Sequence, residues 1–311
     1  MTVSTNSTLY LSHPDCELHD MGDTHPESPA RLSTINTAVQ VVDWEGRLIR
    51  ALAPELDLAG LYTAHPKHYV SAIFEKAPSE GIIALDPDTR MNPHSLQAAR
   101  LAAGAGVNAT ERVLAGEFKN AFCAVRPPGH HAETAVSMGF CMFNSIALAA
   151  HRALASGVAR VAILDFDVHH GNGTVEIFAD KPEVLVCSSF QWPFYPGRFD
   201  QVDLPNIVLT PLEAGTHSAA FRSAIERDWE AALNEHRPDI IFVSAGFDAH
   251  IDDPLGGLNL TDADYAWLGT KCTEWADRYA GGRLVSMLEG GYDLNATARS
   301  TTEFVRKLAG L

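Results

Sequence analysis

The sequence predicts an α/β protein in which a mainly parallel central sheet lies between two layers of helices, as a single three-layer αβα domain. Three observations support this fold class. Short, continuously apolar runs recur along the chain, amphipathic helical patterns separate them, and polar clusters directly follow four of the runs. Strands of a parallel sheet are buried on both faces, so they are continuously apolar and do not alternate with polar residues.

Six apolar runs are predicted to be the buried strands: 8–12, 121–125, 160–166, 183–189, 239–246 and 283–291. A helical pattern lies before the fifth of them. In residues 216–239, large apolar side chains recur at four-residue steps, Thr216 is placed to cap the start, and Pro238 stops the pattern.

Two further helices are predicted on the same grounds. Residues 261–282 place several aromatic and apolar side chains on one face, Thr261 and Asp264 are suited to cap the first turn, and Gly281 is suited to the end. Residues 142–157 show a similar pattern. The alternation of strand and helix is typical of βαβ units.

The composition is that of a soluble globular protein and excludes several function classes. Of the 311 residues, 46% are hydrophobic and 20% are charged. With 39 acidic against 23 basic residues, the formal charge of −16 disfavours direct nucleic acid binding and favours cationic ligands. No segment supplies the roughly 18 consecutive apolar residues of a membrane span. We therefore expect a cytoplasmic protein that binds no membrane, and association into a homo-oligomer stays open.

The chain shows no repeat or linker, so one catalytic domain is predicted over 1–311, with residues 1–7 as a flexible tail. Residues 12–31 form a long polar loop, which we expect at the rim of a binding site. Its histidines are expected to be solvated: His13, His19 and His25. The five cysteines are scattered and lack a C-x-x-C pair, which argues against a disulfide framework or a cysteine zinc site.

Four polar clusters predict the functional site. They directly follow four of the predicted strands, at 126–131, 167–173, 247–254 and 289–294. The carboxyl ends of parallel strands meet at one edge of the sheet, and ligands of open α/β sheets bind there. We therefore expect the four clusters to converge on one rim.

Two of the clusters contain a candidate metal site. Asp165, Asp167 and His169 alternate, so an extended backbone would direct all three to one side. Two of them, together with Asp248 from a separate strand end, would form a three-ligand zinc site with an open position. The alternative is a polar strand end whose side chains only cap turns. Asp248 has no second acid at the next positions, so one catalytic metal ion is predicted.

The other two clusters contain candidate acid–base groups. His130 and His131 follow two prolines and a glycine that favour a tight turn. Two adjacent imidazoles with different pKa values can take a proton from water and give one to a leaving group. Tyr292 follows two glycines, and its hydroxyl can donate to a developing oxyanion. A structural role is the alternative for each residue.

Together these motifs resemble the zinc-dependent histone deacetylase family, specifically its class II-like branch with the bacterial histone deacetylase-like amidohydrolases. Members of this family have the arginase–deacetylase fold. The resemblance covers nearly the whole chain, through the segments HPESPAR, RPPGHHA, GFCMFN, DFDVHHGNGT, FYPG, SAGFDAHIDDPLGG and LEGGY, in that order.

The resemblance implies a role for each matched residue. One catalytic zinc ion would be bound by Asp167, His169 and Asp248. A second set would carry the proton chemistry: His131 as general base and acid, His130 as its electrostatic partner, Asp165 bound to His130, Asn172 in contact with His131, and Tyr292 polarising the amide carbonyl. Asn172 stands where other branches carry Asp, which supports the class II assignment.

The family also implies a narrow tunnel for an acylated lysine, with walls at Phe140 and Tyr195 and a backbone acceptor at Gly139. Leu255 stands at a substrate-selecting position. Structural K⁺ is implied near the main chain of Asp165, Asp167 and His169. Arg31 matches a family arginine on the inner, product-release side of the site.

The implied reaction converts an acyl-lysine-type amide to a free amine and a carboxylate. An acylated lysine peptide and a small cationic amide both suit an acidic chain. Polyamine-specialised relatives carry an acidic residue where this sequence has Leu255, so acetylpolyamine deacetylation is the alternative. A catalytically silent acyl-lysine-binding module would have lost a ligand, a histidine or the tyrosine. A dinuclear manganese ureohydrolase resembling arginase would need further aspartates, and the sequence lacks them.

Overall fold

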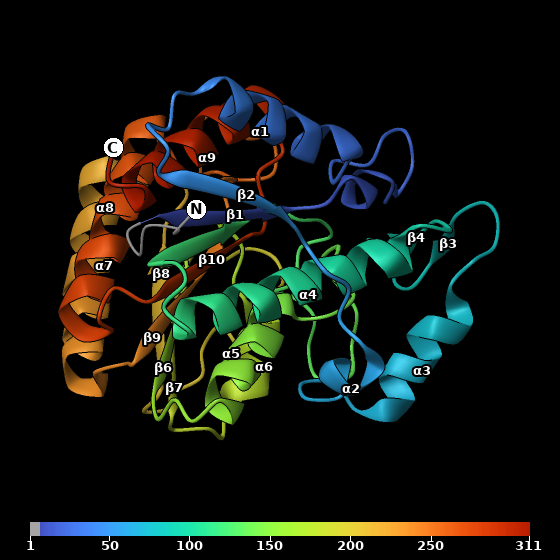
Figure 1. Cartoon of the computed structure of the whole chain (residues 1–311), viewed down its shortest axis with the longest axis horizontal. Coiled ribbons are helices and arrows are strands. Elements are labelled where there is room, and N and C mark those ends of the chain that lie inside the picture. The colour runs from blue at the N-terminus through green and yellow to red at the C-terminus, as the bar shows by residue number, and fades with distance from the viewer. Residues whose placement is uncertain (1–6) are drawn as a thin grey trace.

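The computed structural model describes residues 7–311 and confirms the predicted α/β class (Figure 1). One eight-stranded sheet has the order β2-β1-β5-β10-β9-β6-β7-β8, and every neighbouring pair is parallel. Its strands are β1 (Thr8–Ser12), β2 (Leu48–Leu52), β5 (Asn120–Cys123), β6 (Val161–Asp165), β7 (Val184–Gln191), β8 (Ile207–Leu212), β9 (Ile240–Ala245) and β10 (Leu284–Leu288). A separate antiparallel pair comprises β3 (Ile83–Ala84) and β4 (Arg90–Met91).

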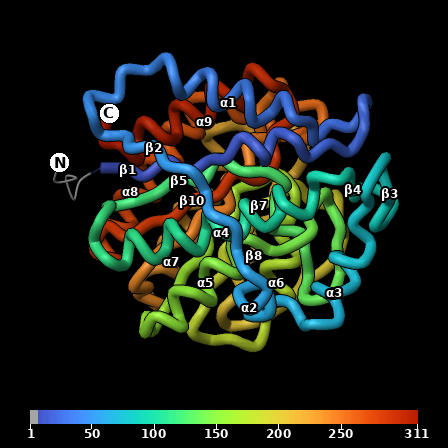
Figure 2. Tube along the Cα trace, turned by 45° about the vertical axis from the view of Figure 1, so that its right-hand side comes forward, coloured from blue at the N-terminus to red at the C-terminus, as the bar shows by residue number. Residues whose placement is uncertain are grey.

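Helices cover the sheet on both faces. On one side α1, α9, α8 and α7 pack in succession, and α4, α5 and α6 form the other layer (Figure 1). Figure 2 shows β3, β4 and α3 on the side of the molecule away from the C-terminus. The helices are η1 (Pro14–Glu17), α1 (Pro29–Val41), α2 (Leu58–Leu61), α3 (Lys67–Lys76), α4 (Ser95–Leu114), α5 (Ser145–Ala155), α6 (Asn172–Phe178), α7 (Ser218–His236), α8 (Asp262–Tyr279) and α9 (Leu294–Leu308).

The predicted strands and helices occur, with local differences at their ends. α8 begins with the expected capping box, in which Thr261 and Asp264 satisfy each other's backbone N–H groups. α7 begins at Ser218, and Thr216 does not cap it, because the Thr216 hydroxyl donates to the Glu213 carbonyl. Of the predicted tail, residues 1–6 lie outside the described residues, and Ser7 is buried.

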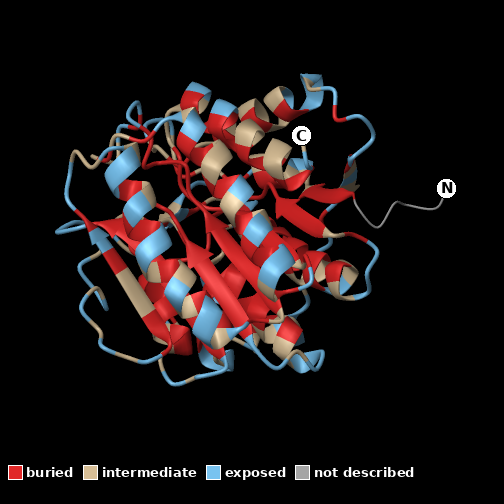
Figure 3. Cartoon of the chain, turned by 90° about the vertical axis from the view of Figure 1, so that its left-hand side faces the viewer, coloured by how far each residue is buried: buried red, intermediate tan, exposed pale blue. Residues whose placement is uncertain are grey.

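The core lies on both faces of the sheet, where the strands are buried and the helices turn their polar faces outward (Figure 3). The apolar stripe predicted for α7 packs inward, and Trp229 of α7 meets Trp275 of α8 with ring centroids 6.3 Å apart. Within residues 7–311, no helix combines the length and apolar character needed to cross a membrane.

A buried histidine, His65, fixes the start of α5. Its Nδ1 lies 3.0 Å from the Thr134 carbonyl, and its Nε2 accepts the Asn144 N–H at 2.9 Å. Asn144 in turn caps α5 by accepting the Ala147 N–H. Both ring nitrogens are therefore used by a neutral imidazole, and burial lowers the pKa of His65 to about 4.

We expect this histidine to make the protein less stable in acid. The folded pKa lies below the unfolded value, so the stabilisation is complete above pH 6.5 and is lost as the pH falls toward 4. The loss amounts to about 3 kcal/mol, since one pKa unit corresponds to about 1.4 kcal/mol. Urea unfolding between pH 4 and 7 measures it. His65→Gln, which cannot titrate, should flatten this part of the profile; an unchanged slope would show that other groups cause it.

Candidate active site

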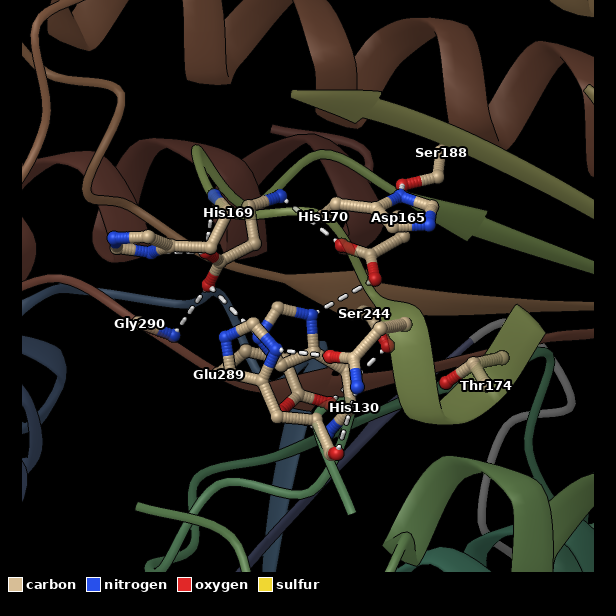
Figure 4. A network of polar contacts seen from close by, with 12 residues as sticks. His130, Asp165, His169, His170, Thr174, Ser188, Ser244, Glu289 and Gly290 are labelled. Carbon is tan, nitrogen blue, oxygen red and sulfur yellow. Dashed lines mark hydrogen bonds and ion pairs between the residues drawn. The ribbon is translucent and has the colours of Figure 1, made fainter. Parts of the chain in front are cut away.

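The predicted site residues meet at the carboxyl edge of the sheet. His130 and His131 follow β5, Asp167 and His169 follow β6, Asp248 follows β9, and Tyr292 follows β10. The strand β6 ends at Asp165, so the backbone is not extended through all three alternating residues. Asp165 consequently turns to His130 (Figure 4). Asp167 and Asp248 instead lie beside His169.

Asp167, His169 and Asp248 form the one group of three metal-binding side chains within the described part of the chain, with ligand atoms within 4.8 Å of one another. The Nδ1 atom of His169 lies 3.0 Å from Asp167 Oδ1 and 3.0 Å from Asp248 Oδ2. One imidazole nitrogen and two carboxylate oxygens directed at one point fit a zinc ion. The cluster therefore suits a single metal rather than a dinuclear centre.

The three side chains of this cluster have pKa values that differ from their usual ones in different directions. Burial acts to lower the pKa of His169, but its hydrogen bonds to the two carboxylates raise it to about 10. Burial and the neighbouring Asp167 charge raise the pKa of Asp248 to about 7. Burial also opposes ionisation of Asp167, but the His130 and His169 cations outweigh it and lower the Asp167 pKa. The two carboxylates therefore share the positive charge of His169, and this imidazole must lose its proton before it can bind a metal ion.

Backbone N–H groups hold these carboxylates in place. Asp167 Oδ2 accepts the Gly290 N–H at 2.8 Å, and Asp248 Oδ1 accepts the Val168 N–H at 2.8 Å. A Cβ atom at Gly290 would collide with the carboxylates of both acids, so only glycine allows this approach.

His130 and His131 lie with ring centroids 4.0 Å apart and have opposite surroundings. His130 Nδ1 is 2.9 Å from Asp165 Oδ2; burial acts to lower the His130 pKa, but Asp165 and Asp167 raise it well above its usual value (Figure 4). His131 Nδ1 is 2.7 Å from Asn172 Oδ1, and burial together with the His130 and His169 charges lowers its pKa well below the usual value. A pair with separated pKa values is the arrangement that acid–base catalysis needs.

Glu289 supports this pair from behind. Its Oε2 accepts the backbone N–H groups of Gly129 and His130, at 2.7 and 3.1 Å, and its Oε1 accepts the Ser244 hydroxyl at 3.1 Å (Figure 4). Burial raises the pKa of Glu289 to about 7. Sequence reasoning gave this residue no role, because one acid beside two glycines carries no distinguishing spacing.

A cavity of about 440 Å³ opens above the cluster. All four predicted substrate-binding residues line it, together with His131, His169 and Tyr292: Gly139, Phe140, Tyr195 and Leu255. Gly139 has a φ of +57°, and a Cβ there would collide with the His131 ring. The other lining residues were not predicted: Asp88, Gln191, Phe194, Pro254, Gly256 and Gly257. Asp88 and Gln191 lie in segments without a recognised motif, whereas the others belong to the quoted segments FYPG and SAGFDAHIDDPLGG, in which sequence reasoning assigned them no role.

The polar loop at 12–31 is partly buried beside the site: no residue of it lines the cavity, but His25 packs edge-on against the cavity residue Phe140 with ring centroids 4.7 Å apart. His19, Glu27 and Arg31 are buried, against the expectation of solvated histidines for His19. Glu27 pairs with Arg31 and Arg126, and burial opposes its ionisation while Arg126 lowers its pKa. Part of the polarity of this loop is explained by Glu27 and Arg31, which belong to a buried network of charged side chains with Arg126.

Arg31 connects that network to Tyr292. Its guanidinium donates to the Glu289 and Gly291 carbonyls and lies 4.8 Å from the centre of the Tyr292 ring. Burial raises the pKa of Tyr292 well above its usual value, although Arg31 opposes the rise. The Tyr292 hydroxyl therefore keeps its proton at neutral pH and can donate a hydrogen bond at the cavity wall.

The fold and this site define a hydrolytic enzyme with the arginase–deacetylase architecture. The histone deacetylase domain family matches residues 25–308. The histone deacetylase-like amidohydrolase of Pseudomonas aeruginosa is 38% identical over 277 residues, covering 86% of this chain and 72% of the relative. A probable deacetylase of Archaeoglobus fulgidus is 36% identical over 295 residues, covering 92% and 82%. The crystal structure of the HDA15 HD domain superposes with a TM-score of 0.91 at 33% identity, covering 98% and 90%.

The chain therefore belongs to the histone deacetylase family, as its motifs predict. It is an enzyme of the deacetylase and amidohydrolase class.

Proposed function

We propose that this chain is a zinc-dependent deacetylase that hydrolyses acyl-lysine-type amides, and that residues 1–311 act as one catalytic domain. The observation that carries the proposal is the convergence of Asp167, His169 and Asp248 beside His131, at the base of a cavity with aromatic walls. Asp167, His169 and Asp248 would hold the zinc ion. When bound, zinc supplies a Lewis acid that polarises the amide carbonyl and makes water more acidic.

The side chains of this protein would then move the protons. Because Asn172 Oδ1 can only accept, His131 Nδ1 carries the hydrogen of that contact, and Nε2 is left to take a proton from the attacking water. His131 afterwards gives this proton to the leaving amine. His130, held by Asp165, keeps positive charge near the reaction centre, and the Tyr292 hydroxyl donates to the developing oxyanion.

The cavity favours a linear acyl-lysine over a polyamine. Leu255 lines the cavity with an apolar side chain, so no carboxylate at that position pairs with a second ammonium group. Acetylpolyamine is the second candidate substrate, because the net charge of −16 attracts any cationic amide.

Structural K⁺ near Asp165, Asp167 and His169 stays a prediction from the resemblance. A cytoplasmic location is proposed because all five cysteines are buried and unpaired, as is common in reducing compartments.

Release of acetate from an N-acetyl-lysine peptide and from an acetylpolyamine, measured side by side, tests the proposal. We expect the metal-stripped protein to be inactive, the zinc-reconstituted protein to bind one zinc per chain, and the peptide to be hydrolysed with the higher kcat/KM. Faster turnover of the acetylpolyamine would identify the chain as an acetylpolyamine deacetylase, the second candidate. Zinc binding without turnover on either substrate would reject both, and turnover that survives metal removal would reject zinc dependence.

A further inference from the structure

The loop between β7 and β8 reaches over the base and one metal-binding side chain. Phe194 stacks on His169 with ring centroids 5.4 Å apart and an interplanar angle of 16°. Tyr195 meets the His131 ring edge-on, at 5.3 Å and 89°. Both aromatic residues line the cavity. The position of residues 192–200 therefore affects the width of the cavity and the setting of the two imidazoles.

Two side-chain contacts hold this loop. Trp192 Nε1 donates to Asp200 Oδ2 at 3.0 Å and ties its two ends together. Arg198 donates from Nε to Glu133 Oε1 and from a terminal nitrogen to Glu133 Oε2, each at 2.7 Å. The Glu133 side chain is only 5% exposed, whereas that of Arg198 is 48% exposed. A buried carboxylate needs a cation, and the planar fork of arginine fixes its orientation as well as its charge.

Glu133 also sets the orientation of the group that holds the base. Its Oε1 accepts Asn172 Nδ2 at 2.8 Å, and Asn172 Oδ1 lies 2.7 Å from His131 Nδ1. The two ends of an asparagine amide have the same shape, so its orientation depends on the partners of each end. A carboxylate accepts only, which directs Nδ2 toward Glu133 and Oδ1 toward His131. This orientation requires hydrogen on His131 Nδ1 and leaves Nε2 free.

We propose that Arg198 is a positioning residue for catalysis, which acts through Glu133 and Asn172 on the tautomer and orientation of His131. This inference rests on the proposed function, since it assigns His131 the role of base. Arg198 lies on the cavity loop, so the same ion pair links the position of that loop to the orientation of the base. A substrate-contacting role is not part of the proposal, because Arg198 does not line the cavity.

Steady-state kinetics of the zinc-loaded enzyme on the acetyl-lysine peptide provide the first test. Arg198→Ala should lower kcat about tenfold and change KM less than threefold. Arg198→Lys, which keeps the charge but not the fork, should recover part of the loss. Glu133→Gln should lower kcat at least as much, because an amide no longer fixes the Asn172 orientation. The double variant should be no worse than Glu133→Gln alone, since both residues act through one path.

Arg227→Ala provides the matched control, since Arg227 is an exposed arginine with a similar two-point contact to Asp228, at 2.7 and 2.9 Å. It should retain full activity, and thermal unfolding should show that all variants remain folded at the assay temperature. A raised KM with unchanged kcat in Arg198→Ala would mean that the arginine only holds the cavity wall. If the losses of kcat in the two single variants add up in the double variant, Arg198 does not act through Glu133. Either result overturns the proposal.

Nitrogen-15 NMR of histidine side chains separates this inference from the proposed function. The wild type should show His131 protonated on Nδ1, with the signal identified by its loss in His131→Gln. Arg198→Ala and Glu133→Gln should shift that population toward the other tautomer. This measurement needs no turnover, so it decides the inference even if the wild type hydrolyses neither substrate. An unchanged His131 signal in both variants would overturn it.

Discussion

Replacing Tyr292 by phenylalanine is expected to lower kcat/KM about 100- to 1,000-fold, the loss typical for removing one donor to an oxyanion. The ring should keep its place, because Phe140 packs edge-on against it at 5.8 Å and Arg31 lies over it at 4.8 Å. Only the hydroxyl donor is lost. Since this donor acts on charge that develops during the reaction, kcat should fall while the affinity for an uncleaved acyl-lysine peptide stays nearly constant.

Tyr279→Phe is the matched control for this effect. It removes the same hydroxyl from a tyrosine on α8 that does not line the cavity. Steady-state kinetics together with peptide binding by calorimetry measure both variants. If Tyr292→Phe keeps more than half of the wild-type kcat, the hydroxyl is not the donor to the oxyanion.

Glu27→Gln is expected to destabilise the fold by about 3–5 kcal/mol, the cost of removing one partner from a buried charge network. Glu27 is shared by Arg31 and Arg126, and all three side chains are fully buried. The variant keeps the shape of the side chain but leaves two guanidinium groups without their carboxylate. Because Arg31 also binds the Glu289 and Gly291 carbonyls, activity should fall together with stability.

Urea unfolding at neutral pH measures this change. Glu55→Gln is its control, because Glu55 pairs with Arg100 at 2.9 Å on a solvent-accessible part of the surface. Such a pair contributes about 1 kcal/mol or less. Equal destabilisation by the two substitutions would show that the buried network stabilises the fold no more than a surface ion pair does.

The sequence predicts the sheet well because its central strands are continuously apolar. The two terminal strands, β2 and β8, were not predicted, since LIRAL and IVLTPL are interrupted by a charge or a proline. Among the helices that were also not predicted, α4 buries mainly alanine and glycine, and α9 buries Thr297, Ser300 and Thr301 beside its apolar side chains. A search for large apolar side chains at helical spacing does not pick out such faces.

The candidate site could be predicted where residues of one kind cluster beside a strand. The paired histidines and the alternating acids made His131, Asp167 and their neighbours visible. Glu133, Glu289 and Arg198 are single charged residues whose partners lie far away in sequence, and Glu27 pairs not only with Arg31 but also with Arg126, 99 positions away. Their importance comes from burial and from tertiary pairing, and neither follows from local spacing.

The order of the sheet has a consequence for self-association. The strands at its two edges, β2 and β8, pair on one side only within the sheet, and such edges invite pairing with strands of other molecules. Pro211 lies in β8 and offers no N–H to a further strand. In β2, an antiparallel pairing centred on the middle of Leu48–Leu52 would set Arg50 against Arg50 of another copy. Arg50 and Pro211, which interrupt the apolar pattern of β2 and β8 and so kept these strands from being predicted, therefore also disfavour growth of the sheet into aggregates.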